Sequence, residues 1–477
     1  MTTKILNISF VLLVIILNGC TTSSGIHKNK LQKDIILFVI KDVNIIPMTK
    51  ENKIIENATV VINDSKIVSI NERIPDGAKI IDGKGKWLIP GLIDMHVHTP
   101  TDNNYKYEKS SPTQGANVFI DTQDVMLLYI ANGVTTVFEL NARAPHFSQR
   151  NEIAKGIVIG PRMALAALID GGEGNGRIAN NANDGRQAVR SAKAEGYRFI
   201  KVYSALNIET FKAIVDEAHK QGLKVLGHIP DAFAGHLEEV FIPHFDMVAH
   251  TEEYSKQSQN KTTEDAKYFA KLAKDNNTWL TSSLTTMIWI GKQLRSIDYV
   301  RNSPTLKYLH PLTRDKWLTS NSYFERTSPE FIAHIDTFID FQKKMIKEFN
   351  DAGVPIVAGT DAGIPGVVGG FALQDELGLM VDAGMTNEEV LISATRLPAE
   401  WLGIDDEVGT VEKGKYADLI LLDQNPLENI KNTQTINGVF VNGKWIDKNR
   451  IKKLLSELER KNSKNQDKFK WKERMNY

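Results

Sequence analysis

Six residues with side chains that can bind metal ions stand at the ends of short apolar runs. They are His96, His98, Lys201, His228, His250 and Asp361. His96 and His98 are two positions apart, and residues i and i+2 of a strand point to the same side, so both imidazoles can reach one cation. A charged or imidazole side chain at the end of an apolar strand is otherwise costly to place. The pattern therefore indicates a metal site where several strands end.

The apolar runs that carry these residues alternate with helical patterns, for example at 184–195 and 207–221. Repeated strand–helix units predict a parallel sheet, and eight of them predict a closed (β/α)8 TIM barrel of the α/β class. Active sites of such barrels gather at the C-terminal ends of the strands, where the six residues fall. The eight predicted strands are 92–96, 133–140, 163–169, 199–203, 224–228, 245–250, 279–283 and 355–360.

Two further groups of β-type runs flank the barrel region. Runs rich in Val and Ile, separated by turn residues, occur before it at 35–46, 58–70 and 79–88, and after it at 417–422 and 438–441. We expect the two groups to pair as one small β-sandwich that is discontinuous in sequence. The predicted boundaries are a signal peptide at 1–19, a tether at 20–34, an N-terminal sandwich segment at 35–90, the barrel at 91–402, a C-terminal sandwich segment at 403–448 and a charged helix or tail at 449–477.

The start of the chain has the features of a secretory signal. Lys4 precedes an apolar run that ends at Leu17-Asn18-Gly19-Cys20, and Cys20 is the one cysteine of the chain. Leu-x-Gly-Cys at this place resembles a bacterial lipobox, which predicts a lipid anchor on Cys20. Thr21, in place of the Asp of inner-membrane retention signals, favours the periplasmic side of the outer membrane in the bacterial cell envelope. A buried cysteine in an ordinary N-terminal helix is the alternative.

The composition restricts the class of partner. Lys plus Arg and Asp plus Glu both number 58, so the formal net charge of the 477 residues is zero. This balance gives no electrostatic reason to expect nucleic acid as a partner. Apolar residues make up 42% and charged residues 24%, as in globular proteins. We therefore expect a small-molecule or dipeptide substrate, with homo-oligomers left open.

Four phrases of the sequence are distinctive, and they are PGLIDMHVH at 90–98, GVTTV at 133–137, AGTDAG at 358–363 and GTVEKGKYADL at 409–419. With these phrases the chain resembles the amidohydrolase superfamily, and within it the imidazolonepropionase and prolidase-like branch. The similarity runs from about residue 42 to residue 444, with the phrases in order. One departure is Phe138-Glu139-Leu140, where the branch commonly shows Arg-Asp.

The resemblance implies roles for the six residues. His96, His98 and Asp361 would hold a first divalent metal, His228 and His250 a second, and Lys201, carboxylated by CO2, would bridge the two. Zinc suits such ligands, with iron, manganese and nickel as alternatives. Metal-held water loses a proton near neutral pH and becomes a nucleophile, and Asp361 can act as general base. An unmodified Lys201, which would imply one metal, is the alternative.

Specificity should come from the loops after the strands. The sequence offers a Gly-rich loop at 170–176, Tyr203 facing the cavity, Arg143 as partner of a substrate carboxylate, and a long aromatic-rich loop at 290–328 that forms either a lid or outer packing. A secreted protein of this kind favours cleavage of a dipeptide or an N-acyl amino acid. Cyclic amidase or deaminase-type hydrolysis, a nonhydrolytic metal enzyme and a catalytically silent binding lipoprotein are the alternatives.

Overall fold

The computed structural model describes residues 37–101, 120–172 and 174–474, all within one compact unit that spans residues 36–477. The predicted signal peptide, Cys20 and the tether lie outside the described residues. Within the described ranges, no helix combines the length and the apolar character that crossing a bilayer requires.

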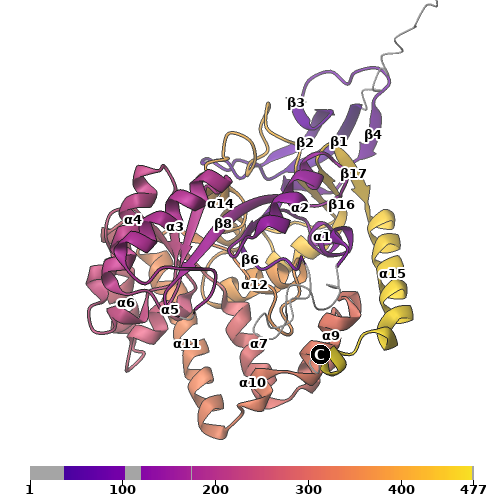
Figure 1. The fold of residues 1–477 in the computed structure, drawn as a ribbon. Helices are drawn as coiled ribbons and strands as arrows, with labels where there is room; N and C mark the ends of the chain where they lie inside the picture. Colours follow the sequence, from indigo (N-terminus) through magenta and orange to yellow (C-terminus); the bar gives the residue numbers. More distant parts are fainter. Residues whose placement is uncertain (1–36, 102–119, 173, 475–477) are drawn as a thin grey trace, which may run out of the picture. The chain divides into compact units, whose positions relative to one another are not determined.

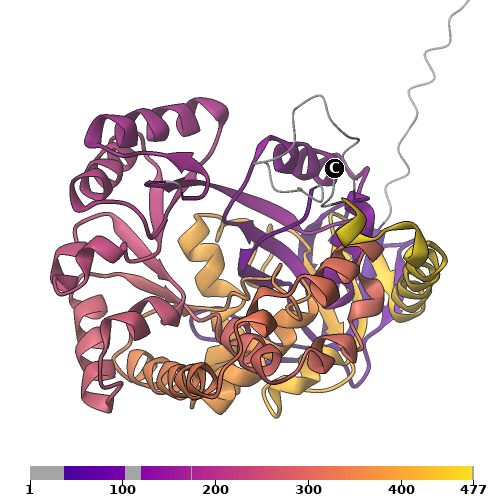
Figure 2. The ribbon, with the colours of Figure 1, turned by 60° about the horizontal axis from the view of Figure 1, so that its bottom comes forward.

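Eight parallel strands form the barrel, and each of the eight predicted runs overlaps one of them (Figures 1 and 2). The last strand meets the first through backbone hydrogen bonds, because Met95 N donates to Ala358 O at 2.9 Å and His98 N donates to Ala362 O at 2.9 Å. The predicted (β/α)8 class is confirmed. In order around the barrel, the strands are β6 (Leu92–Val97), β7 (Val134–Glu139), β8 (Arg162–Asp170), β10 (Phe199–Val202), β11 (Lys224–Gly227), β12 (Phe245–Ala249), β13 (Trp279–Thr281) and β14 (Ile356–Val357).

The barrel strands read as unbroken apolar runs because both of their faces are covered. Every residue of β6, β7 and β10 is buried. Inward residues such as Phe138, Leu226 and Met247 fill the barrel interior, whereas outward residues such as Val137 and Val225 pack under the helices. Strands buried on both faces lack the polar alternation of half-exposed strands.

Helices surround the strands, and several of them begin at a side-chain cap. Asn181 Oδ1 accepts a hydrogen bond from Asp184 N at the start of α3, and Asn207 does the same for Thr210 N at the start of α4. The helices between the strands are α1 (Thr122–Ala131), α2 (Ala144–Ala154), α3 (Ala182–Glu195), α4 (Ile208–Lys220), α5 (Thr251–Gln257), α6 (Thr263–Asp275), α7 (Leu284–Arg295), α8 (Asp298–Arg301), α9 (Pro311–Thr319), α10 (Ser322–Glu325), α11 (Pro329–Asp351), α12 (Phe371–Asp382), α13 (Asn387–Ser393) and α14 (Arg396–Leu402).

The predicted loop at 290–328 is wrong in its secondary structure, because most of this segment is helical. It contains the end of α7 and all of α8, α9 and α10. Short polar helices of this kind lack a clear apolar period, and local caps define them instead. Pro311 occupies the first turn of α9, and the Asn321 side chain accepts hydrogen bonds from the first turn of α10.

The flanking β segments form one mixed sheet that folds back on itself, which confirms the predicted sandwich. Ile67 N donates to Lys415 O at 2.9 Å and Ala417 N donates to Ser65 O at 2.8 Å, so the segment before β15 joins the far edge of the sheet. An apolar core lies between its halves. The strand order is β17 (Lys444–Asp447), β16 (Ile436–Val441), β15 (Leu419–Leu422), β5 (Trp87–Pro90), β1 (Leu37–Ile45), β2 (Ile55–Asn63) and β3 (Lys66–Ile70), with β4 (Lys79–Asp82) also paired to β1.

The sandwich is joined directly to the first barrel strand, since only Gly91 separates β5 from β6. Gly91 N donates to Asp418 O at 2.8 Å. A Cβ atom at this position would lie 2.0 Å from Thr135 Oγ1, so only glycine fits this close approach. This junction fixes the start of the strand that carries His96.

A charged helix was predicted after residue 449, and α15 (Lys448–Asn465) occupies this region, followed by α16 (Trp471–Arg474). Helix α15 packs against α1 (Figure 1). Leu458 is buried, and Lys461 Nζ lies 2.6 Å from Asp124 Oδ2.

Candidate metal centre

Three of the predicted ligands converge where β14 meets β6. His96 Nε2 lies 3.3 Å from His98 Nε2 and 3.2 Å from Asp361 Oδ1, and His98 Nε2 lies 3.1 Å from Asp361 Oδ1. Ligand atoms about 2.1 Å from a tetrahedral cation are about 3.4 Å apart, so this spacing fits one ion. Among the His, Cys, Asp and Glu side chains that the structure describes, this is the one group of three or more with its ligand atoms so close together.

The buried carboxylate of Asp94 connects the two strands that carry this cluster. Its Oδ1 accepts hydrogen bonds from Thr360 N at 3.0 Å and His96 N at 3.2 Å, and its Oδ2 accepts one from Thr360 Oγ1 at 2.8 Å. Asp361 follows at once with a φ of 53°, a conformation that costs a residue with a Cβ about 1–2 kcal/mol. Asp94 thus holds in register the chain ends that present His96 and Asp361.

Asp361 is suited to the role of a carboxylate ligand or base. Although burial opposes its ionisation, the hydrogen bond with His98 and the neighbouring His250 lower its pKa to about 2. It therefore carries a negative charge at neutral pH, in a site otherwise formed by nitrogen ligands.

Lys201 lies beside the cluster, where a group that bridges two cations would have to be. Its side chain is buried, and Nζ is 3.0 Å from His96 Nε2. Burial lowers the pKa of the Lys201 amine to about 8, against the opposing charge of Asp361. Only a neutral amine can combine with CO2, so the environment suits carboxylation, which itself stays a prediction.

The rings of His228 and His250 border the same space. The His250 ring centre is 4.4 Å from that of His96 and 5.2 Å from that of His228. Burial lowers the pKa of His250 to about 3 and that of His228 well below its usual value, so both rings are neutral. His228 Nε2 is buried without a hydrogen-bond partner among the described residues. An unpartnered buried lone pair beside other ligand atoms fits a metal position.

The remaining predicted site residues lie in different places. The Tyr203 ring packs on His228, with centres 4.0 Å apart, and burial with the charge of Asp361 raises the pKa of Tyr203 to about 12. Arg143 is exposed at the start of α2, where its backbone N donates to His146 Nδ1 at 2.9 Å. Tyr203 is therefore adjacent to the metal centre, whereas the role of Arg143 stays a prediction.

The predicted Gly-rich loop is anchored by Asp170 at the end of β8. This carboxylate accepts hydrogen bonds from the backbone N of Gly171, Asn175 and Ala205, each at 2.9 Å. Glu173, within the loop, lies outside the described residues. The anchored part of the loop is tied to the segment after β10, which carries Tyr203.

Two buried glutamates that the sequence analysis did not select contact the histidines. Glu139 lies beside His98, and Glu253 lies beside His228. A signal was present in both cases, because Glu139 is a charged residue next to the end of the second predicted strand and Glu253 follows His250 by three residues. Glu139 is also where the sequence departs from the related branch.

A pocket of about 170 Å³ opens beside His98 and Gly363. Its wall is mostly apolar and includes Leu128, Trp317 and Val368, and the charged residues Asp124 and Lys316 also line it. The segment predicted as a lid contributes to this wall through α9. Of the aromatic residues in this segment, Tyr308 and Trp317 line the pocket, whereas Tyr299 and Phe324 are exposed. Burial and the charge of Asp361 raise the pKa of Tyr323 to about 12.

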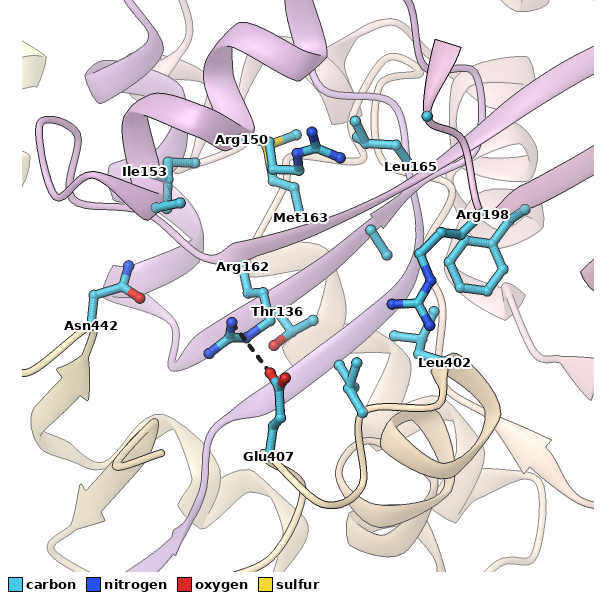
Figure 3. Close-up of a pocket in the computed structure, with 15 residues that line it drawn as sticks. Thr136, Arg150, Ile153, Arg162, Met163, Leu165, Arg198, Leu402, Glu407 and Asn442 are labelled. Atoms are coloured by element: carbon cyan, nitrogen blue, oxygen red, sulfur yellow. Dashed lines mark ion pairs between the residues drawn. The ribbon is translucent and has the colours of Figure 1, made fainter. Parts of the chain in front are cut away.

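A second cavity, of about 310 Å³, opens at the opposite ends of the strands. Figure 3 shows Arg162, at the start of β8, facing Glu407 across it, with 3.7 Å between Nη1 and Oε2. Arg198 lines this cavity just before β10, whereas Lys201 lies near the other end of the same strand. The cavity is therefore separate from the metal centre.

The fold and the cluster together define a barrel with a metal-binding centre at its C-terminal end. The model of the amidohydrolase family matches residues 87–446. The chain belongs to this family.

Individual proteins are similar over parts or most of the chain. A 5-methylthioadenosine/S-adenosylhomocysteine deaminase of Bacillus thuringiensis (strain Al Hakam) is 38% identical over 58 residues, which span 11% of the chain and only 13% of the deaminase. A Xaa-Pro dipeptidase structure with bound methionine in the active site is 20% identical with a TM-score of 0.65, covering 86% of the chain and 100% of the dipeptidase. Bottromycin amidohydrolase is 19% identical with a TM-score of 0.69, covering 89% and 90%. The two structural likenesses show a shared fold.

Proposed function

We propose that the protein cleaves the amide bond of a small dipeptide or N-acyl amino acid with the help of one or two divalent cations. The observation that carries this proposal is the convergence of His96, His98 and Asp361, with Lys201 and the neutral rings of His228 and His250 beside them. A bound cation would supply a water acidic enough to lose its proton near neutral pH, and a Lewis acid for the scissile carbonyl.

The residues of the chain have defined tasks in this reaction. The Asp361 carboxylate, ionised at neutral pH, accepts the proton of the attacking water and passes it to the leaving nitrogen. His98 Nε2 lies 3.1 Å from Asp361 Oδ1, so the two side chains would hold the same cation, which fixes the position of this carboxylate. Tyr203, packed on His228, restricts the space beside the reacting carbonyl.

The pocket beside His98 supports the class of substrate. Its volume of about 170 Å³ and its mostly apolar wall suit one apolar side chain. Lys316 lines the same pocket, with its Nζ 4.6 Å from the centre of the Trp471 ring, and its positive charge would attract a substrate carboxylate. An amino acid residue with an apolar side chain and a free carboxylate combines both features, and a dipeptide or N-acyl amino acid contains such a residue.

The location of the protein is a separate element of the proposal. The segment Leu17–Cys20 supports a lipid anchor on Cys20 and a place on the periplasmic side of the bacterial cell envelope. Such a location would bring the site into contact with peptides and acylated amino acids outside the cytosol.

Metal content and a substrate panel test the proposal. The protein and its Lys201→Ala variant are produced with zinc or manganese and bicarbonate, with Lys224→Ala, near the opposite barrel end, as control. We expect near two metals per chain in the parent and control, a loss in Lys201→Ala, and hydrolysis of apolar dipeptides or N-acyl amino acids by the parent. One metal in all three proteins would exclude the Lys201 bridge. No metal in the parent, or release of ammonia from aminopurines without amide cleavage, would refute the proposed function.

A further inference from the structure

Glu253 is a buried carboxylate directed at the ring of His228. Its side chain is 1% exposed, and Oε1 lies 3.2 Å from His228 Nδ1. Two donors fix the carboxylate, since Ile229 N donates to Oε2 at 3.1 Å and Lys256 Nζ donates to Oε1 at 2.7 Å. Ser204 Oγ also lies 2.9 Å from His228 Nδ1. The side of the ring that carries Nδ1 is thus occupied by polar groups of the protein.

Glu139 stands in the same relation to His98. Its side chain is also 1% exposed, and Oε1 lies 3.4 Å from His98 Nδ1. Thr99 N and Thr99 Oγ1 donate to Oε2 at 2.5 Å and 2.8 Å, and Asn141 N donates to Oε1 at 2.9 Å. The carboxylate is therefore held in place independently of the histidine.

The two contacts repeat one arrangement around the barrel. His98 follows β6 and Glu139 ends the adjacent strand β7, whereas His228 follows β11 and Glu253 comes just after the adjacent strand β12. In each pair the carboxylate faces Nδ1, and Nε2 is left on the side of the metal centre. His98 Nε2 contacts Asp361, and His228 Nε2 has no hydrogen-bond partner in the described part of the chain.

This geometry selects one form of each ring. An imidazole that donates its Nδ1–H to a carboxylate keeps a lone pair on Nε2, and the contact also fixes the ring plane and makes Nε2 a stronger ligand. Without the carboxylate, the Nε2–H tautomer and other ring orientations become accessible, and the lone pair is no longer aimed at the cation.

We propose that Glu139 and Glu253 are positioning residues, each for a different cation position. Glu139 orients His98 for the cation shared with His96 and Asp361, and Glu253 orients His228 for the cation shared with His250. The inference rests on the proposed function only in that cations occupy this centre, and it holds whatever substrate is cleaved.

Metal affinity measured at the two positions tests the assignment. The variants are Glu253→Gln and Glu139→Gln, titrated with zinc against a chromophoric chelator, with bound metal counted by mass spectrometry. Glu252→Gln is a matched control, because Glu252 is the adjacent residue and also pairs with Lys256, at 3.1 Å. We expect Glu253→Gln to weaken one of the two affinities by about 10–100-fold and leave the other unchanged, and Glu139→Gln to do the reverse. Glu252→Gln should change neither.

Several outcomes would overturn the inference. One is that Glu253→Gln and Glu252→Gln bind zinc with equal affinities. Another is that Glu139→Gln and Glu253→Gln weaken zinc binding at the same cation position. The third is that the parent protein binds no cation. If Glu253→Gln does not fold, as judged by circular dichroism, Glu253→Asp is titrated instead. That change keeps the charge but shortens the reach to His228, and an unchanged affinity would equally refute the role. Since no step requires hydrolysis, failure of the substrate panel leaves this test intact.

Discussion

Replacing Gly227 by alanine tests how closely the strands that carry Lys201 and His228 must approach. Gly227 precedes His228, and its φ of +148° is a conformation that residues with a Cβ rarely adopt. A Cβ atom there would lie 2.1 Å from Val202 O. The same oxygen accepts the backbone hydrogen bond from His228 N at 3.0 Å, so the added methyl group meets the contact that positions this histidine.

The size of the effect follows from these distances. Real Cβ contacts are essentially never shorter than 3.0 Å, so β10 and β11 must separate by about 0.9 Å at this point. Backbone strain of about 1–3 kcal/mol adds to about 1–3 kcal/mol for the overpacked strands. Metal coordination tolerates shifts of only about 0.2 Å, so His228 should also lose its cation.

Gly222→Ala is the matched control, because Gly222 lies two residues before the start of β11, with a φ of +66° and open space around its Cβ position. We expect it to lower the free energy of unfolding by only about 1 kcal/mol and to keep the metal content of the parent. Urea unfolding in a chelator gives the stabilities, and mass spectrometry gives the metal content. Equal losses of stability in the two variants, or full metal content in Gly227→Ala, would refute this account of the strand contact.

Four further outcomes are expected. Asp361→Asn should lower kcat for amide hydrolysis by about 10²–10⁴-fold because the general base is lost, and an unchanged kcat would place the base elsewhere. A bound cation at 100 times its Kd should raise the free energy of unfolding by about 2.7 kcal/mol, and chelation should remove this contribution. The thermal midpoint should therefore fall on chelation and recover when zinc is added, whereas an unchanged midpoint would contradict binding. Glu376→Met should lower the free energy of urea unfolding by about 1–3 kcal/mol, because Leu284 N and Thr285 N lose their buried acceptor; no loss would contradict this role. Cys20→Ser should move the protein from the membrane fraction to the soluble fraction and abolish labelling with fatty acid, whereas membrane retention would refute the anchor.

The barrel could be predicted because each strand is a local signal. Runs such as 224–228 and 245–250 are apolar, bounded by polar turns, and spaced by helices. For the sandwich, the sequence indicated two separate groups of β segments but not which residues of the two groups pair. The contact between Ile67 and Lys415 joins residues far apart in the chain, and nothing in either segment specifies the other. The helices within 290–328 were missed because caps, rather than an apolar period, define them.

The metal ligands could be predicted because imidazole and carboxylate groups at the ends of buried strands are costly to bury unless they bind something. The groups that orient them were harder to identify. Glu252 and Glu253 are adjacent and identical in type, and only the fold shows that Glu253 is buried against His228 whereas Glu252 is not. In the same way, Asp94 appears in sequence as one more residue of an apolar strand, although it joins β6 to Thr360.

Backbone strain connects the barrel to the placement of its ligands. Three successive strands, β12, β13 and β14, are each followed by a residue with positive φ: His250 at 79°, Ser283 at 52° and Asp361 at 53°. Each costs about 1–2 kcal/mol, so the surrounding structure must impose it.

Backbone hydrogen bonds beyond the strand ends impose these positive φ values. Thr251 N donates to Ser282 O at 3.4 Å, Ser283 N to Gly359 O at 3.1 Å and Asp361 N to His96 O at 2.8 Å. Each turn is thereby held by the next strand, and the last is held by the first strand of the barrel. Closure of the barrel thus fixes the position of Asp361 against His96. The ligands could be identified from their residue types at the strand ends, whereas the left-handed turns that bring them together follow only from the closed barrel.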